Sequence, residues 1–213
     1  MAQELRPREG LDTLLRALKL PVFVELRASL EARGDAEGWR FEEYLYQLAT
    51  HAVQDRKRKR IERLVKLSGV PTEKTLAALK LDRLSTSVRR LLPTLCEGGF
   101  VEGAENVLAF GLPGRGKTHA LCAIANELLL RGYKVLFTPA YRLVQRLLVA
   151  KRALALEREL RALDAFDVVA IDDIGYIKQD REEWLRLRRD MPRPLPIPWR
   201  LWRHQAVQPD GSM

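Results

Sequence analysis

The feature that most constrains this sequence is a glycine-rich stretch, GLPGRGKT, that runs from Gly111 to Thr118. It matches the Walker A pattern, in which glycines let the backbone bend tightly enough for successive N–H groups to point at phosphate oxygens. Gly114 and Gly116 permit this path, and Arg115 is expected to face outward. Such a loop connects a buried strand to a helix, so the motif predicts an α/β fold.

The residues on both sides of the loop predict alternating strands and helices. Short apolar runs typical of buried strands occupy 106–110, 135–138 and 168–172. An amphipathic helical pattern follows the loop, and a longer one ends near Leu163. The order strand, loop, helix, strand, helix, strand predicts a parallel sheet.

The residues of the loop have separate predicted tasks. Lys117 is predicted to reach the β and γ phosphates, and Thr118 is predicted to offer its hydroxyl to magnesium. The helix that begins there directs its positive end at the anion. The alternative is a chance match in a glycine-containing turn. The complete predicted nucleotide-binding set is Gly111, Leu112, Pro113, Gly114, Arg115, Gly116, Lys117, Thr118 and His119.

Two consecutive acids, Asp172 and Asp173, follow the third apolar run and match a Walker B element. Asp172 is predicted to orient the magnesium together with Thr118, and Asp173 is predicted to act as the general base on the attacking water. Asp173 and Lys117 are therefore the predicted catalytic residues. The alternative is an aspartate pair that caps a helix or a turn.

A cluster of cations on a predicted helix is the second candidate site. The chain has 37 basic and 28 acidic residues and a formal charge of +9, which favours polyanionic partners. Like charges at i and i+4 destabilise an isolated helix, and double-stranded DNA phosphates would relieve that repulsion without sequence preference. The alternative is a solvated helix face. The predicted DNA-binding residues are Arg56, Lys57, Arg58, Lys59, Arg60 and Arg63.

Glycine and proline positions predict the domain organisation. The helices before residue 68 are expected to be short, with a break between Gly34 and Gly38, and a helix near 87–92 is expected to end at Pro93. Alternating prolines exclude a helix or a central strand from 191 to 199. The predicted parts are a helical domain at 1–70, a connector at 71–105, a P-loop core at 106–183 and an atypical Pro/Arg/Trp tail at 184–213.

The stretch from about Phe41 to Glu183 resembles the IstB-like ATP-binding proteins, transposition helper ATPases of insertion sequences that are related to DnaC-type helicase loaders. The resemblance rests on QDRKRKRIERL, LCEGGFVEGAENVLAFGLPGRGKTH, RGYKVLFTPAYRLVQRLLVAKR and FDVVAIDDIGYIKQDREE. It implies an AAA+ P-loop NTPase fold behind a small helical domain, homo-oligomeric assembly on DNA with ATP, and a partner transposase. In this pattern Asp172 matches the metal-binding acid, whereas Asp173 stands where many AAA+ proteins have glutamate.

The tail departs from this family pattern after Glu183, as a frameshift or an early stop would produce. The family's sensor strand, which lies between the Walker A and Walker B strands, is therefore expected to be missing. Those two strands would then pair directly, or would leave buried backbone groups unpaired at about 1–3 kcal/mol each. We accordingly expect reduced stability and impaired ATP hydrolysis.

Several other functions fit the same residues. A replicative helicase loader would use the same fold, a non-enzymatic DNA-binding remnant would use only residues 40–70, and a nonproductive pseudogene product would use neither site. Cys96 and Cys122 have no spacing typical of a disulfide framework or a zinc site. No stretch approaches the ~18 uninterrupted apolar residues of a membrane helix, so a cytoplasmic protein without a membrane partner is expected.

Overall fold

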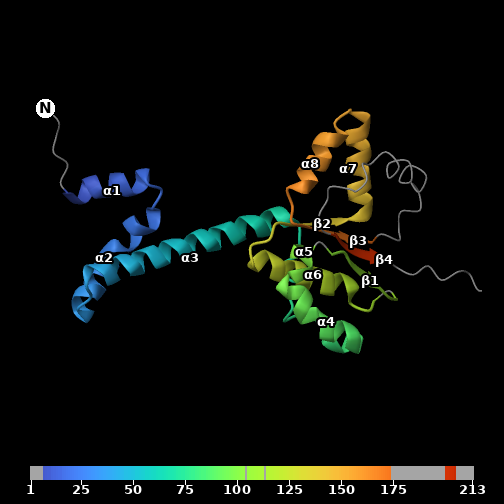
Figure 1. The fold of residues 1–213 in the computed structure, drawn as a ribbon, viewed down its shortest axis with the longest axis horizontal. Coiled ribbons are helices and arrows are strands. Elements are labelled where there is room, and N and C mark those ends of the chain that lie inside the picture. Colours follow the sequence, from blue (N-terminus) through green and yellow to red (C-terminus); the bar gives the residue numbers. More distant parts are fainter. Residues whose placement is uncertain (1–6, 104, 113, 174–199, 205–213) are drawn as a thin grey trace, which may run out of the picture. The chain divides into compact units, whose positions relative to one another are not determined.

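The computed structural model describes residues 7–103, 105–112, 114–173 and 200–204. Its contacts divide the chain into two compact units, Met1–Glu62 and Arg63–Met213. The division falls inside α3 (Phe41–Ser68), a helix that the two units share. Figure 1 shows the elements of both units, which are described separately below.

The first unit is helical and consists of α1 (Pro7–Ala17), α2 (Pro21–Glu37) and most of α3. The break expected between Gly34 and Gly38 comes later than Gly34, because α2 continues through this residue and ends at Glu37, with Gly38 as its C-cap in a left-handed conformation with φ 69°. A Cβ atom added at Gly34 would lie 3.2 Å from the Trp39 ring. Gly34 therefore provides room for the indole rather than a break in the helix.

The end of α3 lies where the sequence predicted it. The helix ends at Ser68, and Gly69 follows in a left-handed conformation with φ 68°. The hydroxyl of Ser68 accepts a hydrogen bond from the backbone N–H of Val70 at 3.0 Å. This contact pairs the N–H of a residue just after the helix end.

The second unit is built on a four-stranded parallel sheet. Its strands are β1 (Val107–Phe110), β2 (Val135–Pro139), β3 (Val168–Asp172) and β4 (Arg200–His204), in the order β1-β4-β3-β2. The structure thus confirms the predicted α/β class and the first three strands. Along β3 the buried side chains alternate between two clusters, with Val168 and Ala170 in one and Val169 and Ile171 in the other. Helices therefore cover both faces of the sheet, as parallel strands require.

Strand β4 corrects the expectation that the sheet lacks its middle. This strand comes from the tail and pairs in parallel with β1 on one side and with β3 on the other. Leu201, for example, is opposite both Val107 and Ala170. The ladder hydrogen bonds of β1 and β3 are thus made to β4, and the direct pairing of β1 with β3 does not occur. The predicted exclusion of a strand from 191–199 concerns residues outside the described part of the chain.

Helices α6 (Lys117–Leu130), α7 (Ala140–Arg152) and α8 (Leu156–Asp164) connect and cover the strands (Figure 1). α6 carries the main core, since Cys122, Ala125 and Leu128 have no exposed surface. The single long helix expected to end near Leu163 is instead two helices, α7 and α8. Leu154 separates them with a left-handed φ of 54°.

A second helical correction concerns the segment before the sheet. Helix α4 (Thr86–Glu97) begins after the N-cap Ser85 and contains Pro93 in its interior, so the expected end of the helix at this proline is wrong. The helix continues because Leu92 and Cys96 on either side of Pro93 are buried in the core. It ends instead at Gly98, and the short α5 (Gly99–Glu102) follows.

Candidate functional site

The glycine-rich loop lies between the end of β1 and the start of α6. Gly114 and Gly116 have φ angles of 75° and 77°, which side-chain-bearing residues rarely adopt. A Cβ atom at Gly116 would also lie 3.7 Å from the Leu84 side chain. The backbone thus follows a path that glycine permits, whereas Pro113 lies outside the described residues.

Lys117 is the first residue of α6 and is 9% exposed. Its Nζ donates hydrogen bonds to the carbonyl oxygens of Gly111 and Leu112, both at 2.6 Å. The ammonium is therefore held against the loop, where it compensates for its burial by contacts with polar atoms. This position places the positive charge beside the backbone groups that would surround a phosphate.

Thr118 and Asp172 meet beside the loop, although they belong to different elements. The Thr118 hydroxyl donates a hydrogen bond to Oδ1 of Asp172 at 3.4 Å. Asp172 is the last residue of β3 and is 6% exposed. The topology brings them together, because α6 follows β1 directly and the carboxyl ends of β1 and β3 lie at the same edge of the parallel sheet.

Asp173 follows β3 with a φ of 58° and is partly exposed. A positive φ is uncommon outside glycine, but aspartate and asparagine tolerate it better than other residues do. The backbone conformation thus favours aspartate over the glutamate that stands here in many AAA+ proteins. Sequence reasoning found this acid but gave no indication of its conformation.

These groups fit a nucleotide with Mg²⁺ by their chemistry. Hydroxyl and carboxylate oxygens are the ligands that Mg²⁺ prefers, and one or two protein ligands are enough when phosphates supply the others. No group of three or more His, Cys, Asp or Glu side chains able to hold a metal exists within the described ranges.

The remaining predicted loop residues differ in their surroundings. Arg115 and Leu112 are exposed. The His119 ring is half-buried and one of its nitrogens lies 3.1 Å from the carbonyl oxygen of Thr75. His119 therefore contacts the segment before α4 within the second unit.

Sequence reasoning did not identify the residues that face the loop from this segment. A hollow of about 430 Å³ beside Gly116 and Thr118 is also lined by Lys74, Lys80 and Arg83. In the sequence these cations are scattered along an irregular stretch, and no motif connects them with the loop. Only their charge could have suggested an anion site.

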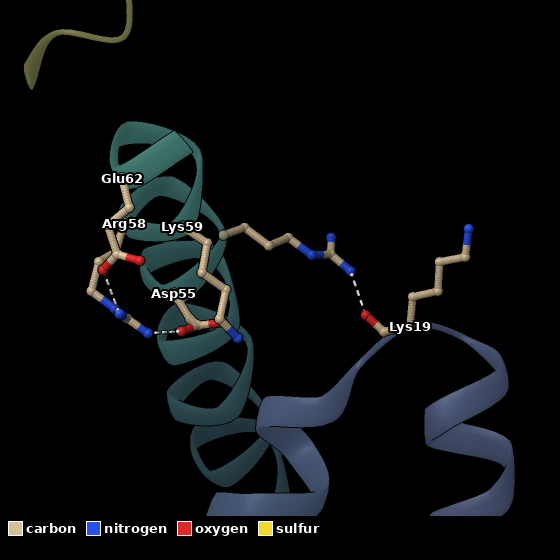
Figure 2. A network of polar contacts seen from close by, with 6 residues as sticks. Lys19, Asp55, Arg58, Lys59 and Glu62 are labelled. Carbon is tan, nitrogen blue, oxygen red and sulfur yellow. Dashed lines mark hydrogen bonds and ion pairs between the residues drawn. The ribbon is translucent and has the colours of Figure 1, made fainter. Parts of the chain in front are cut away.

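The predicted DNA-binding cations divide into two sets on α3. Arg58 forms ion pairs with Asp55 at 2.5 Å and with Glu62 at 2.7 Å, and Lys59 pairs with Asp55 at 2.7 Å (Figure 2). These contacts lower the pKa of the Asp55 carboxyl, mainly through the hydrogen bond from Lys59. Part of the predicted run is thus already paired with carboxylates on its own helix.

Three other cations of the run are spaced along one face of α3. Arg56, Arg60 and Arg63 recur at i, i+4 and i+7, a spacing that keeps them on one face of a helix. Arg56 donates a hydrogen bond to the carbonyl oxygen of Lys19 at 3.2 Å, and all three are exposed. Lys57 is exposed as well.

Two further observations bear on the expectations for cysteines and membranes. Cys96 and Cys122 are both buried free thiols. None of the helices within the described ranges has the length and apolar character that a membrane span requires.

Comparison with known proteins gives a consistent family assignment. Residues 13–188 match the IstB-like ATP binding proteins. An insertion-sequence ATP-binding protein of Sinorhizobium fredii is 34% identical over 174 residues, which are 81% of this chain and 58% of that protein. The corresponding protein of Geobacillus stearothermophilus is 31% identical, over 81% of this chain and 69% of its own length.

A third insertion-sequence ATP-binding protein, from Pseudomonas aeruginosa, is 32% identical over 81% of this chain and 65% of its own length. The chain thus spans 58% to 69% of these three relatives. Among solved structures, AMPPCP-bound DnaA from Aquifex aeolicus is similar with a TM-score of 0.48 and 19% identity, over 64% of this chain and 43% of that chain.

Proposed function

The chain belongs to the family of IstB-like ATP-binding proteins, and on this premise we propose that it binds ATP with Mg²⁺ at the Gly111–Thr118 loop and assists DNA transposition. The observation that carries the nucleotide site is the 3.4 Å hydrogen bond between Thr118 and Asp172. This bond joins the two predicted magnesium ligands, one in the first turn of α6 and the other at the end of β3. A chance glycine turn would give no reason for this contact.

Each residue of the site has a proposed role. Loop N–H groups and Lys117 bind phosphate oxygens, while Thr118 and Asp172 hold the metal. The bound Mg²⁺ would neutralise charge that develops on the phosphates. Asp173, one residue beyond the metal-binding acid, would hold a water and accept its proton.

The structure alters the argument about hydrolysis. Impaired turnover was expected because the middle of the sheet would be missing, and β4 occupies that place. The physical reason for a weakened sheet is therefore removed. We propose that Asp172 and Asp173 are held at a sheet edge that is stable enough to position them.

We further propose that α3 binds double-stranded DNA through Arg56, Arg60 and Arg63. Their common face and exposure support contacts with successive phosphates, which supply affinity without sequence preference. Arg58 and Lys59 must exchange carboxylate partners for phosphates. A partner transposase is part of this proposal, since the relatives carry insertion-sequence names. These names favour transposition over helicase loading. A homo-oligomer is proposed from the family resemblance alone.

The nucleotide site is tested by titrating fluorescent mant-ATP with Mg²⁺ into the wild type and into Lys117→Ala. We expect the affinity to fall at least about tenfold, because a charge-assisted contact contributes about 1.5–3 kcal/mol. Lys134→Ala is the matched control, since Lys134 is an exposed lysine at the start of β2. Equal weak signals from all three proteins would instead favour a DNA-binding remnant.

A further inference from the structure

The first part of the predicted connector, residues 71–84, is attached to the helix that begins at the phosphate loop. In this subsection and in the Discussion, "the connector" means these residues. Nδ2 of Asn126 on α6 donates hydrogen bonds to the carbonyl oxygens of Pro71 and Lys74, both at 3.1 Å. His119 contacts the carbonyl oxygen of Thr75, also at 3.1 Å. The connector is thus held beside the loop at several points within the second unit.

Apolar contacts fix the other end of the connector. Leu79 and Leu84 are buried in the same core cluster as α6. The 3-10 helix η1 (Leu81–Arg83) lies between them and ends with Arg83. Lys80 and Arg83 are themselves exposed, so both side chains extend from an anchored backbone. An anchored backbone lowers the entropy cost of directing a cation at a ligand.

The hollow between the connector and the loop has a strongly cationic lining. The hollow has a volume of about 430 Å³. The connector lines it with Lys74, Lys80 and Arg83, and the loop and the start of α6 line it with Gly116, Lys117 and Thr118. Among the described residues, no carboxylate lines it. Such a lining attracts anions, and the residues that it shares with the phosphate loop identify the anion as the phosphate tail of a nucleotide.

A second hollow supports this orientation. It measures about 500 Å³, is lined mainly by aliphatic side chains, and shares Arg83 and Lys117 with the cationic hollow. A nucleotide has one charged end and one flat, largely apolar end. The two adjoining hollows offer matching surroundings for these ends, with Arg83 at the junction.

We propose that Lys80 and Arg83 bind the phosphate tail from the side opposite the loop, so that the connector forms half of the nucleotide site. This inference rests on the proposed ATP site. The two side chains would then recognise the number of phosphates rather than the base. This role makes a distinct prediction, because removing the two cations should weaken ATP binding far more than AMP binding.

The experiment measures the affinities for ATP, ADP and AMP by calorimetry in the wild type and in the double variant Lys80→Ala/Arg83→Ala. We expect ATP binding to weaken about tenfold or more and AMP binding less than about threefold. The conservative variant Lys80→Arg/Arg83→Lys should recover ATP binding. Arg90→Ala, which removes an exposed cation of α4 outside both hollows, should change nothing.

Other outcomes would overturn the proposal in separable ways. Equal losses for ATP and AMP would assign the connector to the nucleoside, and unchanged ATP affinity at an unchanged melting temperature would remove it from the site. Loss of duplex DNA affinity with ATP affinity intact would assign the hollow to DNA phosphates. If Lys117→Ala loses ATP but the double variant does not, only this inference fails; if Lys117→Ala binds like the wild type, the proposed ATP site fails as well.

Discussion

The hydroxyl of Thr118 and the carboxylate of Asp172 lie 3.4 Å apart, although 54 positions separate the two residues in the sequence. One lies in the first turn of the helix after the phosphate loop and the other ends β3. A parallel sheet brings these positions to one edge, so the contact follows from the topology and from the register of the strands. It gives the proposed magnesium site a specific geometry that mutations can test.

Removing either proposed magnesium ligand should reduce the gain in ATP affinity that Mg²⁺ provides. We expect Thr118→Ala and Asp172→Asn to reduce this gain at least about tenfold, because metal affinity depends strongly on each ligand and its orientation. The measurement is ATP affinity with Mg²⁺ and with EDTA. Asp35→Asn, at an exposed carboxylate of α2, should retain the full difference. An undiminished Mg²⁺ effect in both site variants would contradict the assignment.

The left-handed conformation of Asp173 should make this position selective for its side chain. Glutamate tolerates φ 58° less well, so Asp173→Glu should lower the free energy of unfolding by about 1 kcal/mol, whereas Asp173→Asn should leave it nearly unchanged. Urea denaturation measures both values. Asparagine removes the proposed base, so any steady phosphate release by the wild type should be lost in Asp173→Asn. Phosphate release that survives this change would exclude Asp173 as the base.

The two sets of cations on α3 should contribute unequally to DNA binding. Arg56→Ala/Arg60→Ala should lower the slope of log affinity against log salt by about 2, since each phosphate contact contributes about 0.9. The matched double variant Arg58→Ala/Lys59→Ala should lower it by less than about 1, because these cations are paired with Asp55. Fluorescence anisotropy of a labelled duplex at several salt concentrations gives the slopes. Unchanged slopes in both variants would show that the helix face is merely solvated.

The central position of β4 should make the sheet sensitive to loss of a backbone donor there. Trp202 is opposite Leu108 in β1 and Ile171 in β3. Trp202→Pro should therefore destabilise the protein by about 3 kcal/mol more than Trp202→Ala, because proline removes a ladder donor. Thermal and urea unfolding give the difference. Equal stability of the two variants would mean that β4 does not hold this place in solution.

Burial of Cys96 should appear as a pH dependence of stability. Burial raises the pKa of this thiol to about 11, above its ordinary value of 9.0. Between these two values the unfolded chain releases a proton that the folded chain retains, so stability is complete below pH 9 and falls as the pH rises toward 11. In Cys96→Ala the free energy of unfolding should fall less steeply with pH, because up to one fewer proton is released on unfolding. Identical pH profiles of unfolding would refute the buried neutral thiol.

Local sequence patterns were sufficient for much of this protein. The glycine loop, the three apolar runs and the acid pair indicated a parallel α/β fold and a nucleotide site, because tight turns and buried strands depend on residues adjacent in the chain. Where such a rule failed, packing had overridden it. Pro93 lies inside α4 because Leu92 and Cys96 are buried on either side of it, and Gly34 lies inside α2 where the Trp39 ring packs close to its backbone.

The tertiary structure alone decided which distant segments meet. The short run Arg200–His204 lacks the continuous apolar character typical of a central parallel strand. Nevertheless, β1 and β3 need a partner for their backbone groups, and backbone N–H and C=O groups can pair whatever the side chains are. Likewise, Lys80 and Arg83 line the hollow beside the phosphate loop because Asn126, His119 and the core hold the connector there. The sequence by itself therefore determined the loop, the strands and the acids, whose chemistry is local. Long-range contacts, which no short pattern encodes, decided the middle of the sheet and the position of the connector beside the loop.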